Sequence, residues 1–93
     1  GARVVAAFKT NFASTITEPA DSSGRPREVH YAGDDEEAKA IVAELIRGIG
    51  FEPLDYGTLA QAVVLDHMVP LMIRLDARLH KSSRKSSFRL AGP

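Results

Sequence analysis

The sequence predicts a small α/β fold, in which a mixed sheet of about three strands contains a strand–helix–strand unit and carries a long hydrophobic second helix. Three observations support this prediction: an apolar run at 3–8, alternating strand and helix patterns over 28–57, and a nearly continuous apolar helical pattern over 58–80. With 93 residues, of which 44% are hydrophobic, the chain suits one small domain or a fragment of a longer protein. The expected segments are strand and loop (1–16), mobile loop (17–27), strand–helix–strand (28–57), long helix (58–80) and basic tail (81–93).

The composition excludes several classes of site. Cysteine is absent, which removes disulfides, thiolate metal sites and cysteine nucleophiles, and fits a reducing, cytoplasmic location. No signal-like segment opens the chain and no uncharged run of 18 residues occurs, so membrane insertion is not expected. Six bases but one acid lie between Arg74 and Arg89, which is compatible with an acidic ligand or nucleic acid, but a solvated polar surface is the simpler interpretation. Phe88 is the only aromatic residue of the tail, which argues against nucleic-acid binding because single strands stack on aromatic side chains.

The first expected strand covers residues 3–8, with the sequence RVVAAF. Its lack of alternation predicts a strand buried on both faces, as in a parallel or mixed sheet. Lys9, Thr10 and Asn11 follow, and α/β folds place ligands outside the carboxyl ends of parallel strands. These side chains are therefore candidates for ligand binding, although many strands end in polar loops. Residues 17–27 hold two prolines, a glycine and several polar residues, which predicts an exposed, mobile loop.

Residues 28–32, with the sequence EVHYA, alternate as a strand does, and Gly33 is expected to end it. Asp34 is the expected N-cap of the following helix, with Glu37 three residues on as its capping-box partner. The run of four acids at 34–37 is better explained by capping than by a cation site, because consecutive helical residues point in different directions.

The helix that follows carries apolar residues at a spacing of 3, 1, 3, 1 and 3, which predicts one stripe facing a sheet. Gly50 or Gly48 is expected to end this helix in the left-handed conformation. Residues 51–56 then predict a strand, and Pro53 within it favours an edge position because proline lacks a backbone donor. The stripe consists of Ala38, Ile41, Val42, Leu45, Ile46 and Ile49.

The second helix is expected to begin at Thr58 and is apolar nearly all round over 59–79. Such a pattern predicts burial on more than one side, and a domain of this size can hardly surround it. We therefore expect a second domain or a second copy of the chain to cover helix 59–79, most simply as a homodimer. Pro70 in its interior is expected to kink or divide it.

No catalytic constellation is predicted. His30, His67 and His80 lie far apart without an i, i+4 pair, so no metal site is predicted, and the adjacent residues Asp66 and His67 do not face each other on a helix. The sequence contains no GxGxxG, P-loop or GxSxG motif.

Two stretches, GARVVAAFKTNFAS and YAGDDEEAKAIVAELIRGIGFEPLDYGTLAQA, followed by a hydrophobic helix, resemble the C-terminal half of the deazaflavin-dependent NADP reductase family. That family shows a VVKAFNT strand and loop, a GDDxxAK helix start and a GFxPxDxGPL turn. The resemblance implies the C-terminal part of a Rossmann-like fold, without the glycine-rich half that binds NADP. The sequence departs from the pattern at Ala6, Lys9, Thr58, Val63 and Asp66.

The resemblance implies that the chain is the substrate-side domain of an NADP-linked oxidoreductase and is not competent to bind a nucleotide alone. NADP, with a deazaflavin as second cofactor, would belong to the parent protein, and an upstream nucleotide-binding domain would be a partner; no cofactor is expected for this chain alone. The alternative is a non-catalytic dimerisation or protein-binding module that keeps the fold. The substrate-binding residues that the resemblance implies are Phe8, Lys9, Thr10, Asn11, Phe88, Arg89 and Leu90.

Overall fold

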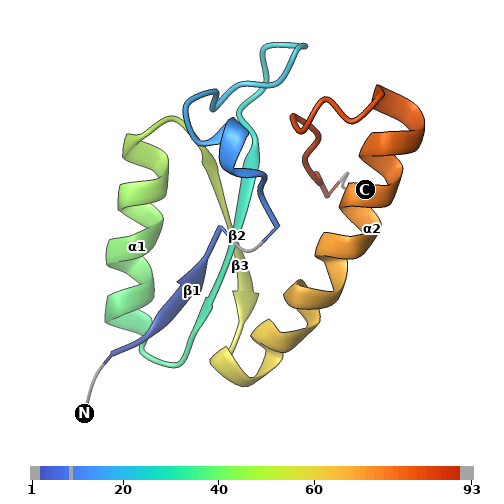
Figure 1. Cartoon of the computed structure of the whole chain (residues 1–93). Helices are drawn as coiled ribbons and strands as arrows, with labels where there is room; N and C mark the ends of the chain where they lie inside the picture. The colour runs from blue at the N-terminus through green and yellow to red at the C-terminus, as the bar shows by residue number, and fades with distance from the viewer. Residues whose placement is uncertain (1–2, 9, 91–93) are drawn as a thin grey trace.

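A computed structural model describes residues 3–8 and 10–90 and shows a three-stranded sheet with a helix to either side of it (Figure 1). The predicted α/β class, with a mixed sheet and a long second helix, is confirmed. The elements in chain order are β1 (Val5–Ala7), the short 3-10 helix η1 (Ala13–Thr15), β2 (Glu28–Gly33), α1 (Glu36–Gly48), β3 (Glu52–Gly57), the 3-10 helix η2 (Leu59–Ala62) and α2 (Val63–His80).

The strand order is β1–β2–β3, with β2 in the centre. β2 pairs parallel with β3, as expected for a strand–helix–strand unit, and antiparallel with β1. All six residues of β2 are buried, whereas the three residues of β1 are only half-buried. The prediction that the first strand is buried on both faces is therefore wrong, because β1 lies at an edge and β2 takes the covered position. Pro53 lies on the other edge strand, β3, as predicted.

Alternation along β2 gives its two faces different characters. Val29 and Tyr31 pack with Ile46 of α1 and with Phe51 to form the hydrophobic core. Glu28 and His30, the residues that alternate with them, belong to the opposite face and are buried as well. The central strand thus has an apolar face toward α1 and a polar face away from it.

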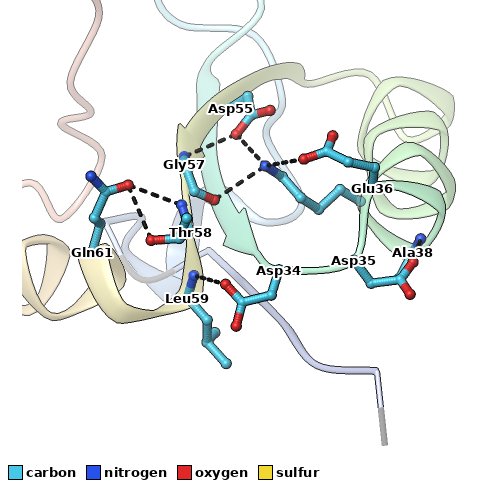
Figure 2. A network of polar contacts seen from close by, with 10 residues as sticks. Asp34, Asp35, Glu36, Ala38, Asp55, Gly57, Thr58, Leu59 and Gln61 are labelled. Atoms are coloured by element: carbon cyan, nitrogen blue, oxygen red, sulfur yellow. Dashed lines mark hydrogen bonds and ion pairs between the residues drawn. The ribbon is translucent and has the colours of Figure 1, made fainter.

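Helix α1 begins one residue later than the sequence predicted. Asp35 is the N-cap, and its carboxylate accepts a hydrogen bond from the backbone N–H of Ala38 at 2.8 Å. Asp34 instead accepts from the backbone N–H of Leu59 at 3.0 Å and so ties the start of α1 to η2 (Figure 2). The expected capping box of Asp34 and Glu37 is wrong, because the carboxylate of Asp34 serves another element. Gly50, with a φ of +96°, ends the helix in the left-handed region, as predicted.

The predicted apolar stripe of α1 covers the sheet only in part. Ile46 is buried and Val42 is half-buried, but Ile41, Leu45 and Ile49 remain 55%, 65% and 55% exposed. A sheet of three strands is narrow, so it covers only a limited arc of the helix. Within that arc lies Lys39, which the sequence placed off the stripe and which is 5% exposed.

Buried Lys39 is the centre of a polar network at the carboxyl ends of β2 and β3 (Figure 2). Its ammonium group lies 2.9 Å from the Asp55 carboxylate, 3.1 Å from the Gly57 carbonyl oxygen and 3.6 Å from Glu36. The hydrogen bond with Asp55 raises the pKa of Lys39, so the side chain stays charged although it is buried. We call these four residues the Lys39 network; it joins α1 to β3.

The second helical segment begins with Thr58, whose backbone N–H donates to the side-chain oxygen of Gln61 at 3.0 Å (Figure 2). Helix α2 then runs without interruption from Val63 to His80 with Pro70 inside it, so the proline does not divide the helix, and the kink that was the other expectation stays a prediction. Only one turn loses a backbone donor to Pro70, and the hydrogen bonds on either side of it hold the helix together. No helix in residues 3–8 and 10–90 is long and apolar enough to cross a membrane.

The chain after α2 turns back and lies between α2 and β2 (Figure 1). The buried Asp76 carboxylate holds this turn, because it accepts hydrogen bonds from Ser83 Oγ at 2.8 Å, Ser86 Oγ at 2.6 Å and the Arg84 backbone N–H at 2.9 Å. These bonds, with that of Ser86 foremost, lower the pKa of Asp76. Residues 81–90, the C-terminal tail, are thereby tied to the helix.

Candidate functional site

Five polar residues gather at the polar face of β2. They come from three segments: the loop after β1, the strand itself and the C-terminal tail. Thr10, Glu28 and His30 are only 1%, 7% and 6% exposed, and burial of such groups costs free energy unless they are hydrogen-bonded. We call Thr10, Asn11, Glu28, His30 and Arg89 the polar β2 cluster.

Thr10 and His30 form a buried pair, with 2.9 Å between Thr10 Oγ1 and His30 Nδ1. Burial lowers the pKa of His30, and the nearby Glu28 carboxylate opposes that shift only in part. The imidazole is therefore neutral at pH 7, and Nδ1 either accepts from the threonine hydroxyl or donates to it, depending on the tautomer. The pair places a neutral histidine in the middle of the central strand.

Asn11 is the one side chain of the cluster in which a buried hydrogen-bonding atom has no partner among residues 3–8 and 10–90. Its Nδ2 donates to the Glu28 carbonyl oxygen at 3.1 Å, which fixes the orientation of the amide. The buried atom without a partner is its Oδ1. An unpaired buried acceptor costs about 1–3 kcal/mol, so proteins rarely keep one without a reason. Asn11 Oδ1 is therefore an acceptor that the rest of the described chain leaves unpaired.

The C-terminal tail closes over the start of β2. The Leu90 backbone N–H donates to Glu28 Oε2 at 3.1 Å, and Arg89 lies 3.9 Å from Glu28 Oε1. The Arg89 guanidinium also donates to the carbonyl oxygen of Pro26. The Glu28 carboxylate is thus the point at which the tail meets the cluster.

The structure brings together four of the seven predicted site residues, namely Thr10, Asn11, Arg89 and Leu90. Phe8 packs elsewhere: its ring meets that of Phe51 edge-on at 5.7 Å, on the core side of the sheet. Lys9 lies outside the described residues.

Phe88 is half-buried in the tail beside Arg89. Glu28 and His30 were not predicted as site residues. The signal that could have found them is their alternation in EVHYA, because two polar side chains on one face of a central strand are buried together.

Thr10 and Asn11 were predicted because they follow the carboxyl end of a strand taken as parallel, and this reason is wrong. Because β1 is antiparallel to β2, with Val5 opposite Gly33 and Ala7 opposite Tyr31, the end of β1 lies toward the amino end of β2. Thr10 and Asn11 therefore follow β1 at the end of the sheet opposite the carboxyl ends of the parallel strands. Those carboxyl ends hold the Lys39 network instead.

A groove of about 940 Å³ lies between the 17–27 loop and the C-terminal tail, and no residue of the polar β2 cluster lines it. Buried Arg27 holds its walls together, because the guanidinium donates to the carbonyl oxygens of Glu18, at 2.9 Å, and of Lys85. An ion pair of 3.0 Å between Lys85 and Glu18 adds a second link. The loop is thus joined to the tail through Arg27, through Lys85 and through the bond from Arg89 to Pro26, and its mobility stays a prediction.

Metal binding has no visible basis in this arrangement. Across residues 3–8 and 10–90, no group of three or more histidine, aspartate or glutamate side chains could hold a metal ion. The hydrogen-bonding groups of the cluster suit an organic ligand with its own donors and acceptors.

No protein-family model and no curated protein matches the chain. Solved structures do match it. A protein from Arthrobacter sp. FB24, provisionally assigned as an F420-dependent NADP-reductase, superposes with a TM-score of 0.85 and 30% sequence identity over 98% of this chain and 40% of that one. The hypothetical protein SMa0349 from Sinorhizobium meliloti superposes with a TM-score of 0.60 and 40% identity over 67% of this chain and 30% of that one.

The present chain therefore spans less than half the length of either protein. The similarity to the Arthrobacter structure supports the resemblance to deazaflavin-dependent NADP reductases that the sequence motifs indicated. That the chain corresponds to the C-terminal half of such a protein stays a prediction.

Proposed function

We propose that this chain is the substrate-side, C-terminal domain of an NADP-linked oxidoreductase of the deazaflavin-dependent type. The observation that carries the proposal is its likeness over 98% of its length, at 30% identity, to the Arthrobacter protein assigned to that activity. Because the chain spans only 40% of that protein, the activity would belong to a larger protein of which this fold is one part.

The polar β2 cluster supports a role in holding the reacting end of a cofactor. The carboxamide of nicotinamide and the pyrimidine ring of a deazaflavin both carry N–H and C=O groups in one plane. Asn11 Oδ1 would accept such an N–H, and neutral His30 keeps positive charge away from it. NADP and the deazaflavin, when bound, supply the hydride chemistry; the residues of this chain would bind and orient them.

The sequence also indicates what the chain does not supply. It contains no GxGxxG motif, and Gly48 and Gly50 follow a helix, whereas a pyrophosphate is held where a helix begins after a strand. Pyrophosphate binding would therefore come from an upstream nucleotide-binding domain. The isolated 93-residue chain would not bind NADP on its own.

Two measurements test this proposal. The reading frame that encodes the chain, expressed in full, is expected to transfer hydride between NADPH and coenzyme F420, followed by absorbance. Calorimetric titration of the isolated chain with NADP is expected to show no saturation up to millimolar concentration. A full-length product that turns over neither cofactor contradicts the assignment of activity, and a saturable NADP titration of the isolated chain contradicts the assignment of the nucleotide site.

A non-catalytic dimerisation or protein-binding module is the second candidate. The observation that favours it is the exposure of apolar side chains along α2, including Val63, Leu71 and Leu79 at 57%, 51% and 62%. Monomeric proteins rarely expose large contiguous apolar patches without an interaction that uses them. Self-association of a full-length product that lacks hydride transfer would favour this candidate over the first.

A further inference from the structure

The groove between the 17–27 loop and the C-terminal tail is separate from the polar β2 cluster and has no role in the proposed function. Its volume of about 940 Å³ lies within the range of small-molecule sites. Ala20 and Leu79 are the only apolar residues among the described residues that line it. Because protein partners usually bury apolar side chains at the centre of an interface, this groove suits a polar small molecule better than a protein segment. We call it the Arg27 groove.

Arg27 brings a buried charge to this groove. The residue is only 5% exposed, yet no carboxylate of residues 3–8 and 10–90 lies within ion-pair distance of it. Its Nε donates to the Glu18 carbonyl oxygen, and its Nη1 donates to the Lys85 carbonyl oxygen and to Ser87 Oγ. A buried charge is normally paired with an opposite charge, because removing a lone ion from water is costly. Arg27 thus has neutral partners but lacks a counter-ion within the described chain.

The guanidinium group of Arg27 also has donors to spare. Its Nη2 donates to no atom of residues 3–8 and 10–90. Nη2 is not sealed in the interior, because Asn11 Oδ1 is the one buried side-chain polar atom of these residues that lacks a partner. Since Arg27 lines the groove, a ligand bound there can accept hydrogen bonds from Nη2.

Two further donors line the Arg27 groove on the side of the tail. Lys81 is exposed and forms no ion pair with a residue that the structure describes. The Ser87 hydroxyl accepts from Arg27, so its own O–H is left to donate. A guanidinium, an ammonium and a hydroxyl group therefore share one groove.

The carboxylates around the groove are already engaged within the chain. Glu18 pairs with Lys85 at 3.0 Å. Asp21 accepts three hydrogen bonds from its own loop, including one from the Ser23 hydroxyl. Asp76 does not line the groove, and it accepts three hydrogen bonds from the tail. Within the described chain, two positive charges of the groove are thus left without a carboxylate.

We propose that the Arg27 groove binds a small molecule through a phosphate group. A phosphate monoester carries a charge of about −1.5 to −2 at pH 7, which matches the two uncommitted cations, Arg27 and Lys81, whereas a carboxylate carries a single charge. Hydrogen bonds from a guanidinium to phosphate oxygens are charge-assisted, and the planar fork of arginine suits their geometry. The phosphate would supply the counter-ion that buried Arg27 lacks. This inference does not depend on the proposed oxidoreductase function.

An NMR titration of the ¹⁵N-labelled 93-residue chain with inorganic phosphate, at constant ionic strength, tests the proposal. We expect the amide resonances of Arg27 and Ser87 to shift with half-saturation near about 10 mM. Sulfate is expected to act like phosphate, and acetate to bind at least about 5-fold more weakly, because it carries one charge.

Two variants of the groove sharpen the test. Lys81→Met is expected to weaken phosphate binding by about 3- to 10-fold, as for the loss of an exposed charge. Arg27→Lys keeps the charge but not the fork, and is expected to weaken binding by about 10-fold. Arg74→Met removes an exposed base that does not line the groove, so this matched control should bind like wild type.

Dispersed amide resonances establish that each variant is folded. Arg27 also links the loop to the tail, so Lys81→Met carries the test if the Arg27→Lys variant does not fold. Three results would overturn the proposal: no shift at the groove with phosphate, equal responses to phosphate and acetate, or equal losses in Lys81→Met and Arg74→Met. A flat phosphate titration would indicate that Arg27 obtains its counter-ion from another segment of a longer protein.

Discussion

Two buried polar regions lie on the same small sheet, and they differ in how completely they are paired. In the Lys39 network, at the carboxyl ends of β2 and β3, the ammonium group has two partners within 3.1 Å and a third at 3.6 Å. In the polar β2 cluster, Asn11 Oδ1 is buried without a partner. A paired network stabilises a fold, whereas an open acceptor indicates a place where a ligand completes the hydrogen bonds. We propose that the first region belongs to the scaffold and the second to the candidate site.

Removal of the Lys39 charge is expected to have the largest effect on stability. Lys39→Met keeps most of the packing but leaves the Gly57 carbonyl oxygen without the ammonium donor and removes one of the donors of the Asp55 carboxylate. We expect the melting temperature to fall by about 10 °C, measured by circular dichroism. Lys85→Met is the control, because its ion pair with Glu18 is half-exposed and such pairs contribute little. Equal melting temperatures for the two variants would contradict the view that the Lys39 network stabilises the fold.

Two glycines give the next comparison. A Cβ at Gly33 would lie 3.1 Å from the Val4 carbonyl oxygen and 3.2 Å from the Lys39 side chain, whereas a Cβ at Gly48 meets nothing within 4 Å. Gly33→Ala is therefore expected to lower the free energy of unfolding by about 1–3 kcal/mol. Gly48→Ala, in a helix, is expected to raise it by about 0.5–1 kcal/mol. Urea titration measures both changes, and a tolerated Gly33→Ala would show that the approach of β1 to α1 is loose.

His30 is expected to make the stability of the cluster depend on pH. Because burial lowers the pKa of His30 below its ordinary value of 6.5, the folded state favours the neutral imidazole. Its contribution is fully present above pH 6.5 and is lost as the pH falls through the lower pKa of the folded state. His30→Gln should therefore lose less stability than wild type between pH 7 and pH 5, and exposed His67→Gln should behave like wild type. Parallel curves for all three proteins would mean that His30 titrates like a solvated histidine.

The smallest stability change is expected at Asn11. Asn11→Leu gives up one hydrogen bond to Glu28 but also removes the unpaired buried acceptor, and these two effects oppose each other. We expect the free energy of unfolding to change by less than about 1 kcal/mol in a urea titration. A loss as large as that of Lys39→Met would place Asn11 in the scaffold rather than in the site.

Much of the fold could be predicted from local patterns. The strand–helix–strand unit, the end of α1 at Gly50 and the edge position of Pro53 follow from periodicity, from the freedom of glycine at positive φ and from the missing donor of proline. The direction of β1 could not be predicted, because an apolar run does not specify whether its neighbour is parallel or antiparallel. For this reason burial on both faces was predicted for β1, whereas β2 has it in the structure. Thr10 was likewise expected at the opposite end of the sheet from the one where it lies.

Part of the candidate site was predicted. Its predicted residues came mainly from the resemblance to a known family and not from a recognisable catalytic or binding motif. Thr10 and Asn11 follow the first strand, whereas Arg89 comes from the far end of the chain and meets Glu28, so the assembly of the cluster depends on the path of the tail. Glu28 and His30 were not predicted, because the alternation of a strand does not show whether its polar face will be buried. Burial of Lys39 was not predicted, because periodicity counts apolar residues and a buried lysine with an aspartate partner does not enter that count.

The central claim, that the polar β2 cluster is the site and the Lys39 network is scaffold, is tested most directly by the hydride-transfer activity of two variants in the full reading frame. We predict that Asn11→Leu lowers kcat/KM for NADPH and coenzyme F420 by about 10- to 100-fold at nearly unchanged melting temperature, an effect of the size expected for a lost binding contact. Lys39→Met should keep kcat/KM per folded molecule within about twofold while its melting temperature falls. Full activity in Asn11→Leu, together with loss of activity in folded Lys39→Met, would contradict the account.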